Sequence, residues 1–423
     1  MGCHQSIQTA LHGWKETTNN QFILETVGKG YKLELTRIPG QIKEFSKSHQ
    51  YQNELQKVLS DYLTRGIVEE SKEVHVCSPF FMIKQNEKFR PILDLRSLNK
   101  FLSYKHFKME GIKEAISLTT KDCFFTKIDL KDAYLSIPIR KQDQRYLGFS
   151  HQGKTYRFTR LPFGLASAPR IFTKIIREAL GPLRTQGITF VAYLDDILIV
   201  AKSKEESERA TTTIQEQLKK LGFTINCKKS SIEPSHRITF LGLELDSTKE
   251  EMRIPTEKIR KMRQELKKLS NNKLVSVKKL ASLIGLLTST NMGFSPAFIH
   301  QRWMQRNVSE YTKDGNWNKI IPLWDSSKLE IKWWLDNLEK YNGKTMSFNS
   351  MQTEIYTDAS LTGWGAHSKE LQLEQQGLWD YWDAQESSNF RELKTVLMAL
   401  QSLNPLPPKK TVLTIRSDNS TTV

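Results

Sequence analysis

An apolar run broken by two acids constrains the fold of this chain more than any other feature. Residues 190–192 (FVA) and 197–200 (ILIV) are β-rich, and Asp195 and Asp196 lie between them. This pattern predicts a hairpin with the Asp-Asp pair as its turn. Acids at a turn are most often ordinary solvated turn formers, so the hairpin alone does not indicate chemistry. The run is also too short and too charged to cross a membrane, which takes about 20 apolar residues.

A second strand that ends in an acid changes this interpretation. Residues 124–129 (FFTKID) read as a strand that finishes at Asp129. If this strand lies beside the hairpin, the carboxylates of Asp129, Asp195 and Asp196 meet at one edge of the sheet. Carboxylates that close repel each other and favour a divalent cation. Two Mg²⁺ ions roughly 3.5–4 Å apart are a standard arrangement for phosphoryl transfer, and Mn²⁺ is an alternative ion.

The charge balance fits a polyanionic partner. The chain has 423 residues, with 63 Lys+Arg against 46 Asp+Glu and a net charge of +17. Such a surface favours nucleic acid, although a basic solubilising coat is the plainer alternative. A hydrophobic content of 38% excludes a wholly disordered chain. The cysteines show no CxxC spacing, so neither a zinc site nor a disulfide framework is predicted, and a reducing compartment is expected. They are Cys3, Cys77, Cys123 and Cys227.

The pattern of elements indicates an α+β protein. Short β-rich runs alternate irregularly with helical ones up to about residue 246, and helices are predicted over residues 166–180 and 204–221. Residues 255–306 are helical and very basic, which suits either a solvated helix pair or a surface that grips a duplex. A further unit begins near residue 353. There, strand, helix and strand carry Asp358, Glu392 and Asp418 in that order.

Several motifs, in this order and at these intervals, resemble the reverse transcriptase family. Residues 127–134 (KIDLKDAY), 161–169 (LPFGLASAP) and 193–196 (YLDD) resemble its palm motifs, and residues 89–100 (FRPILDLRSLNK) resemble its fingers motif. Residues 221–229 (LGFTINCKK) and 240–242 (FLG) resemble the last palm motifs and the primer-holding turn. Three stretches look most like the DIRS-like retrotransposons, which integrate with a tyrosine recombinase. They are residues 90–96, 358–365 and 416–421.

The resemblance implies a right-hand polymerase with fingers, palm and thumb, followed by a ribonuclease H-like α/β domain. It divides the chain into an N-terminal extension (1–50), fingers and palm (51–246), a helical basic thumb or connection (247–345) and the ribonuclease H-like domain (352–423). The family pattern needs one more metal-binding residue after Asp418. We therefore expect that last domain to be C-terminally truncated and its ribonuclease activity in this chain to be doubtful.

The implied activity is RNA-directed DNA synthesis, in which dNTPs extend a DNA primer on an RNA template and form an RNA–DNA hybrid. Asp129 and Asp195 would bind the metals, with Asp196 in support, and Lys229 or Lys228 would protonate the leaving pyrophosphate. A second pair of metals would lie on Asp358, Glu392 and Asp418. The remaining implied roles concern the incoming nucleotide: Arg90 on the triphosphate, Tyr134 as the group that excludes a 2′-hydroxyl, Phe163 and Gly164 beside the nascent base pair, and Lys84 on phosphate.

Other functions remain open from the sequence. One is a domesticated module that binds nucleic acid without catalysis; another is a telomerase or group II intron maturase, which the region around Asp358 disfavours. A recombinase from the same element is a further expected partner, and no membrane partner is expected. We expect a cytoplasmic or nuclear protein that is not secreted. Residues 1–6 (MGCHQS) also fit a short N-myristoylation pattern.

Overall fold

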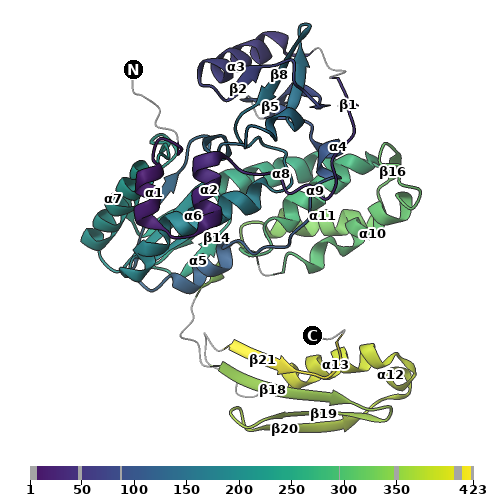
Figure 1. The fold of residues 1–423 in the computed structure, drawn as a ribbon. Helices are drawn as coiled ribbons and strands as arrows, with labels where there is room; N and C mark the ends of the chain where they lie inside the picture. The colour runs from purple at the N-terminus through teal and green to yellow at the C-terminus, as the bar shows by residue number, and fades with distance from the viewer. Residues whose placement is uncertain are drawn as a thin grey trace. The chain divides into compact units, whose positions relative to one another are not determined.

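The computed structural model describes residues 7–45, 50–85, 88–294, 296–346, 352–403 and 412–420. The chain divides into two units, residues 1–345 and 346–423, which are described separately (Figure 1). Within the described residues, no helix combines the length and apolar character that a membrane span requires. The N-myristoylation pattern at residues 1–6 and Cys3 lie outside the described residues.

A four-stranded sheet in unit 1 carries the acids predicted from the sequence. Its order is β11-β6-β10-β9, and β10 pairs antiparallel with both β6 and β9. Helix α7 packs on β6, β10 and β11, and the apolar runs of β6 and β10 lie in the core, where Ile128 and Ile197 are fully buried. The bounds are β6 (Phe124–Asp129), β9 (Phe190–Tyr193), β10 (Asp196–Ala201), β11 (Ser231–Ser235), α6 (Ala168–Thr185) and α7 (Lys204–Lys220).

Helix α6 is longer than the sequence predicts. The predicted helix covers residues 166–180, whereas the helix in the structure runs from Ala168 to Thr185 and includes Pro182. Pro182 lies close to the C-terminal end of α6, so only the one helical hydrogen bond that its missing N–H would donate is lost. Leu183 remains buried there, so packing of the last turn outweighs the cost of one missing N–H.

A second layer of unit 1 is built around a five-stranded sheet, order β1-β3-β7-β8-β2, and the separate hairpin β4–β5. Aromatic side chains from β4, β7 and β8 pack together: Phe149 lies 4.4 Å from Phe80 and 5.4 Å from Tyr156, measured between ring centroids. The elements are β1 (Ile42–Lys43), α3 (Gln52–Thr64), β2 (Val68–Glu70), β3 (Val76–Cys77), β4 (Phe80–Gln85), β5 (Lys88–Leu93), α4 (Arg96–Asn99), α5 (Ile112–Leu118), η1 (Tyr134–Ser136), η2 (Gln144–Tyr146), β7 (Gly148–His151) and β8 (Lys154–Phe158).

The first two helices, α1 (Leu11–Thr17) and α2 (Gln21–Lys29), pack onto α6. Trp14 is fully buried and its Nε1 donates a hydrogen bond to the Leu221 carbonyl at 3.1 Å. Val27 belongs to the same buried cluster as Ile128 and Phe149. The described part of residues 1–50 therefore completes the core of unit 1.

The remainder of unit 1 is mostly helical. A sheet of order β12-β13-β14-β17 precedes and joins four helices, and Trp334 of α11 is buried against Phe294, with 4.7 Å between ring centroids. The elements are β12 (Arg237–Phe240), β13 (Leu243–Asp246), β14 (Glu251–Arg253), α8 (Thr256–Ser270), β15 (Leu274–Ser276), α9 (Val277–Thr288), η3 (Ile299–Gln301), α10 (Arg302–Tyr311), β16 (Ile320–Pro322), α11 (Asp325–Asn337) and β17 (Lys344–Thr345).

Unit 2 is a four-stranded sheet, order β20-β19-β18-β21, with helix α13 packed on β18 and β19. The edge strand β21 runs parallel to β18, which the crossover through α13 allows. Its described core is small and consists of Ile355, Ala366, Leu373, Ala399 and Leu403. The elements are β18 (Gln352–Ala359), β19 (Gly363–Ser368), β20 (Leu373–Leu378), α12 (Tyr381–Gln385), α13 (Ser388–Gln401) and β21 (Val412–Arg416).

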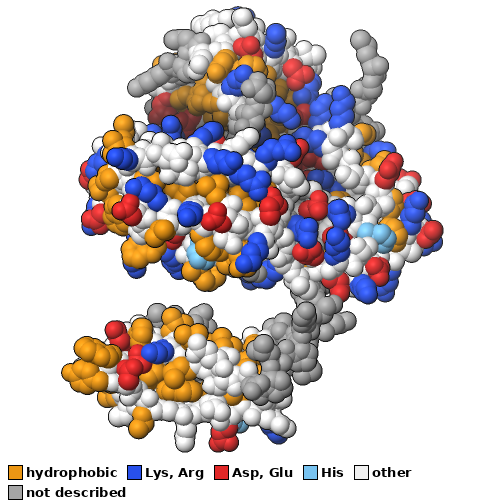
Figure 2. Space-filling view, turned by 180° about the vertical axis from the view of Figure 1, so that it is seen from behind, with side chains coloured by type: hydrophobic (Ala, Val, Ile, Leu, Met, Phe, Trp, Pro, Cys, Tyr) orange, Lys and Arg blue, Asp and Glu red, His pale blue; other side chains and the backbone are white. Residues whose placement is uncertain are grey.

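The two units differ in charge. Residues 346–423 hold 6 of the 63 Lys+Arg and 9 of the 46 Asp+Glu, so the net charge of +17 divides into about +20 for unit 1 and −3 for unit 2. Figure 2 shows Lys and Arg side chains spread across the visible face of unit 1, and hydrophobic side chains on unit 2. The excess positive charge, on which the predicted affinity for polyanions depends, therefore lies in unit 1.

Candidate functional site

The strand register of unit 1 brings the predicted acids together. Asp129 is the last residue of β6, Asp196 is the first of β10, and the two are directly opposite each other in the antiparallel ladder. Asp195 precedes β10, and its carbonyl accepts a hydrogen bond from the Leu130 N–H at 2.9 Å. Three carboxylates from two distant stretches of sequence thus lie at one end of the sheet.

The turn between β9 and β10 differs from the predicted one. Tyr193 and Asp196 form its closing pair, so Leu194 and Asp195 are the central residues. The Asp195–Asp196 turn predicted from the sequence is wrong by one position. Leu194 has φ 53°, a left-handed conformation that a non-glycine residue seldom adopts. The shift puts Asp195 at the tip of the turn, while Asp196 is held in the ladder.

Burial shapes the electrostatics of this group. Burial raises the pKa of Asp195, and the nearby charge of Asp129 raises it further. Burial also raises the pKa of Asp196, against the opposing effect of Lys127, whose Nζ lies 3.9 Å from the Asp196 carboxylate. Lys229 Nζ lies 3.8 Å from Asp129 Oδ2. The acids therefore repel one another in a partly desolvated site, and two lysines only partly offset that repulsion.

Asparagine 226 was not assigned a role from the sequence, yet it contacts the Asp129 carboxylate directly. Its Nδ2 donates to Asp129 Oδ1 at 2.8 Å. Asn226 lies in the 221–229 motif, but a neutral amide carries no charge pattern that would have singled it out. The contact depends on the loop after α7 folding back onto the end of β6, which only the tertiary structure reveals.

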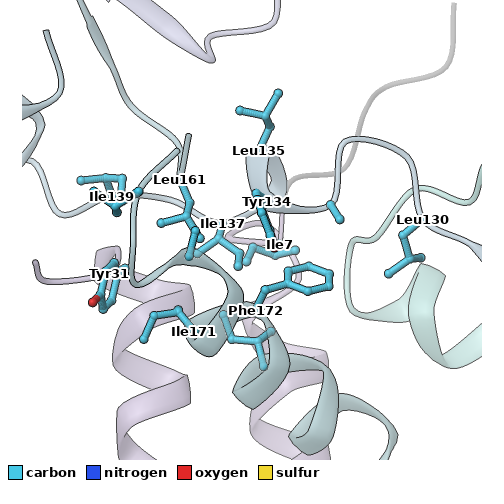
Figure 3. Close-up of a cluster of buried hydrophobic side chains, with 14 of the residues drawn as sticks. Ile7, Tyr31, Leu130, Tyr134, Leu135, Ile137, Ile139, Leu161, Ile171 and Phe172 are labelled. Atoms are coloured by element: carbon cyan, nitrogen blue, oxygen red, sulfur yellow. The ribbon is translucent and has the colours of Figure 1, made fainter. Parts of the chain in front are cut away.

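Two of the residues that are predicted to contact the nucleotide, Tyr134 and Phe163, lie together near these acids. Tyr134 is 8% exposed, and its ring centroid lies 4.9 Å from that of Phe163. The ring also packs near Phe172, at 5.5 Å between centroids (Figure 3). Burial and the charges of Asp195 and Tyr193 raise the pKa of Tyr134 to about 12, so its hydroxyl stays neutral. Phe163 is 53% exposed. Tyr134 is thus a core residue that lies close enough to Asp195 to feel its charge.

The backbone conformation and the close packing at position 164 require a glycine. It has φ 96°, and a Cβ there would lie 2.8 Å from the Leu93 carbonyl oxygen. Asn99, another residue with no predicted role, holds this loop from both sides: its Nδ2 donates to the Gly164 carbonyl and its Oδ1 accepts from the Ala166 N–H, both at 2.9 Å. The loop therefore passes close to β5 in a fixed conformation.

Arg90 and Lys84 do not share a face of the β4–β5 hairpin. Arg90 is paired with Ile83, whereas Lys84 is paired with Phe89. Because cross-strand partners point to the same side and neighbours alternate, the two cations point to opposite sides. Phe89 packs against Tyr51 beside α3, at 5.1 Å between ring centroids, so Lys84 lies on the side that faces α3. The structure does not bring them to one phosphate group.

A second acidic group lies in unit 2. Asp358, Glu392 and Asp418 each offer a carboxylate oxygen, and these atoms lie within 4.8 Å of one another. Asp358 and Asp418 line a cavity of about 870 Å³. Glu392 is 4% exposed, and its Oε2 has no hydrogen-bond partner. Burial raises the pKa of Glu392, as do the charges of Asp358 and Asp418. An unpartnered buried carboxylate oxygen facing two further acids fits a divalent cation.

The acids of unit 1 are gathered less tightly. Among the described residues, three carboxylate oxygens as close together as those of unit 2 are not found for Asp129, Asp195 and Asp196. Asn226 and Lys229 contact the Asp129 carboxylate instead. The donor set, three carboxylates at one edge, still fits hard cations that prefer oxygen.

The sequence of residues 82–245 matches the family described as reverse transcriptase (RNA-dependent DNA polymerase). The matched stretch includes Asp129, Tyr134, Asp195 and Asp196. Two transposon polyproteins of Schizosaccharomyces pombe (strain 972), Tf2-3 and Tf2-7, are each 27% identical over 234 residues. The match covers 54% of this chain and 17% of either polyprotein, so the matched part of the chain spans about a sixth of the length of these relatives.

Solved reverse transcriptases confirm the fold. The foamy viral protease–reverse transcriptase in complex with RNA/DNA hybrid has a TM-score of 0.64 and 18% identity, covering 93% of this chain and 55% of that one. The same protein in complex with dsDNA has a TM-score of 0.63 and 17% identity, covering 99% of each chain. The α+β polymerase fold with an additional C-terminal domain, predicted from the sequence, is therefore confirmed.

Proposed function

We propose that this chain is the RNA-directed DNA polymerase of a retroelement, which transfers nucleotides from dNTPs onto a primer 3′-hydroxyl. The observation that carries the proposal is the pairing of Asp129 with Asp196 at the end of β6 and β10, with Asp195 at the adjoining turn. The reverse transcriptase match over residues 82–245 supports the same reaction.

The metal requirement follows from the donor set. Asp129, Asp195 and Asp196 would hold divalent cations, for which Mg²⁺ is the first candidate and Mn²⁺ the second. Bound there, the cations would supply an activated hydroxyl and charge stabilisation for the leaving pyrophosphate. The raised pKa values of Asp195 and Asp196 are consistent with a site whose repulsion such cations relieve.

The other residues would bind and orient the substrates. Arg90 is exposed on the β4–β5 hairpin and suits a triphosphate. Tyr134, packed between Phe163 and Phe172, presents a rigid wall that would exclude a ribose 2′-hydroxyl. Lys229 lies 3.8 Å from Asp129 Oδ2 and would hold the proton that the pyrophosphate receives. Lys84 points away from Arg90, so Lys88, which is on the Arg90 side, replaces it as the second cation.

The acidic group of unit 2 would form a separate metal site of the ribonuclease H type. The support is the convergence of Asp358, Glu392 and Asp418 within 4.8 Å and the unpartnered Glu392 Oε2. Its substrate would be the RNA strand of the hybrid that unit 1 produces. The DIRS-like assignment and the partnership with a recombinase rest on the motifs at residues 90–96, 358–365 and 416–421.

Substitution of one acid tests the polymerase proposal. Asp195→Asn keeps the size of the side chain but removes a charge, so we expect primer extension on an RNA template to fall by roughly 100-fold or more. Affinity for the primer–template should stay within about twofold. Asp336→Asn, on the exposed face of α11, is the matched control and should extend normally. Extension that persists in Asp195→Asn refutes the assignment, and binding without extension in the unsubstituted protein favours a non-catalytic module.

A further inference from the structure

A short loop, residues 226–230, encloses Asp129 on the side away from β10. The Asn226 N–H donates to the Asp129 carbonyl at 2.8 Å, and the Asp129 N–H donates to Ser230 Oγ at 3.0 Å. The loop is closed by its own bonds, because the Asn226 carbonyl accepts from the Ser230 hydroxyl at 2.9 Å and the Ser230 N–H at 3.0 Å. Both backbone groups of the acid are therefore held by one loop.

The loop takes the place of a strand that is missing at this position. On one side, β6 is paired with β10 as far as Asp129. On the other side, the ladder with β11 begins only at Lys127, opposite Ser231. Without the loop, the end of β6 would be held by β10 alone, and its other edge would be unpaired. The Asn226–Ser230 loop supplies the missing hydrogen bonds where the carboxylate must be held still.

The side chain of Asn226 adds a third contact. Its amide donates to Asp129 Oδ1 at 2.8 Å, while Asp129 Oδ2 faces Lys229 Nζ at 3.8 Å. One loop therefore orients both oxygens of the carboxylate. An amide suits this role because it fixes the oxygen without neutralising it; a lysine at 226 would offset the negative charge that a cation needs, and an aspartate would repel.

We propose that Asn226 is a positioning residue, which fixes the rotamer of the Asp129 carboxylate and couples it to the loop that carries Lys229. This inference rests on the proposed polymerase function. Loss of the amide would leave Asp129 free to rotate and would move Lys229 relative to the reacting group. The effect falls on the chemical step and on cation binding, whereas the nucleotide contacts of Arg90 and Tyr134 are left in place.

Asn226→Leu tests the inference, since leucine has nearly the shape of asparagine and lacks its donor. In the full chain, we expect kcat to fall about 10- to 100-fold while KM for dNTP changes less than about threefold. Mn²⁺ affinity, measured by calorimetric titration without nucleotide in an Asp358→Asn/Asp418→Asn background, should weaken at least about fivefold. Asn226→Ser keeps a short donor and should retain an intermediate kcat.

The control is a second asparagine that holds backbone without touching an acid. Asn342 binds both the N–H and the carbonyl of Ile254, at 2.8 and 3.1 Å. Asn342→Leu should leave the Mn²⁺ titration unchanged. Folded Asn226→Leu with normal kcat and normal Mn²⁺ affinity overturns the inference, and if that variant does not fold, Asn226→Ser is held to the same criterion. If the unsubstituted chain extends no primer, the polymerase proposal fails, and the Mn²⁺ comparison still decides the role of Asn226.

Discussion

Asp246, at the end of β13, is only 4% exposed, and its carboxylate accepts five hydrogen bonds. Its Oδ2 accepts from Arg237 Nη2 at 2.7 Å and Nε at 3.1 Å. Its Oδ1 accepts from the Thr248 hydroxyl at 2.7 Å and from the Thr248 and Lys249 N–H groups at 3.1 Å. Burial alone would raise the pKa of Asp246, but the hydrogen bonds from Thr248 and Arg237 outweigh it and lower the pKa to about 2.

The sign of this shift predicts a pH dependence. An acid whose pKa is lower in the folded state stabilises the fold above its unfolded value, near 3.8, and that stability is lost as the pH falls toward 2. We expect Asp246→Asn to lower the free energy of unfolding by about 1 kcal/mol at pH 7, and the difference to narrow below pH 4. Urea unfolding at pH 7 and at pH 3 measures both values. A difference that stays constant with pH contradicts the ionic contribution.

Some residues of the candidate site can be identified from the sequence alone, and others cannot. Asp129, Asp195 and Asp196 stand out because charged residues at the ends of apolar strands are unusual and need a reason. Asn226 and Asn99 do not stand out, because an amide is common in loops and its partners are carbonyl and carboxylate groups far away in sequence. The residues that the sequence does not identify are those that act by holding another group in position.

Among the helices and strands, α10 depends on a neighbour for its start. No side chain of α10 itself caps its first turn. Glu330 of α11 does so instead: Oε1 accepts from the Trp303 N–H and Oε2 from the Met304 N–H, both at 2.9 Å. Glu330 is 6% exposed, and burial raises its pKa. The carboxylate thus satisfies donors that would otherwise be buried without partners.

Removal of this carboxylate should destabilise α10. We expect Glu330→Ala to cost about 2–3 kcal/mol, because one buried and one partly buried N–H group lose a charged acceptor. Glu330→Gln keeps one acceptor oxygen and should cost less. Hydrogen exchange of the α10 amides, compared with chemical unfolding of the whole chain, locates the effect. Leu329→Ala, on the same helix but 68% exposed, is the control. Faster exchange spread equally over unit 1, or none, would refute the capping role.

At this scale the sequence predicts the existence of elements better than their ends. Strand β6 and helix α7 were predicted nearly to the residue, because apolar periodicity and Gly222 define them. The end of α6 and the β9–β10 turn were misplaced. Pro182 lies inside a helix and Leu194 has a positive φ. In both cases tertiary packing holds a backbone conformation that the residue type disfavours in an isolated peptide.

For the molecule as a whole, the two units should differ in stability. Unit 2 has a described core of five hydrophobic residues and three acids that repel one another, while the core of unit 1 joins α1, α2, the five-stranded sheet and the sheet β11-β6-β10-β9. Domains with little buried apolar surface are the less stable ones. We therefore expect two transitions in differential scanning calorimetry, with unit 2 unfolding first.

Divalent cations should act on the lower of these transitions. Bound Mg²⁺ would relieve the repulsion among Asp358, Glu392 and Asp418, and at about 100 times its dissociation constant it adds about 2.7 kcal/mol. We expect that transition to rise by at least about 4 °C with Mg²⁺ and to fall again with a chelator. In Asp358→Asn/Asp418→Asn, the transition should be higher without metal and insensitive to it. A shift that survives this double substitution places the ion elsewhere.

The unequal charge of the two units predicts how each would behave if the chain were cut between them. A polypeptide with a net charge near −3 gains no long-range attraction toward nucleic acid, whereas one near +20 gains a great deal. If unit 1 binds the hybrid as proposed, covalent attachment would give unit 2 a local concentration in the millimolar range around the bound strand. Supplied in trans at micromolar levels, a severed unit 2 would then meet the hybrid about a thousandfold less often. The peptide linkage itself is then a determinant of substrate access.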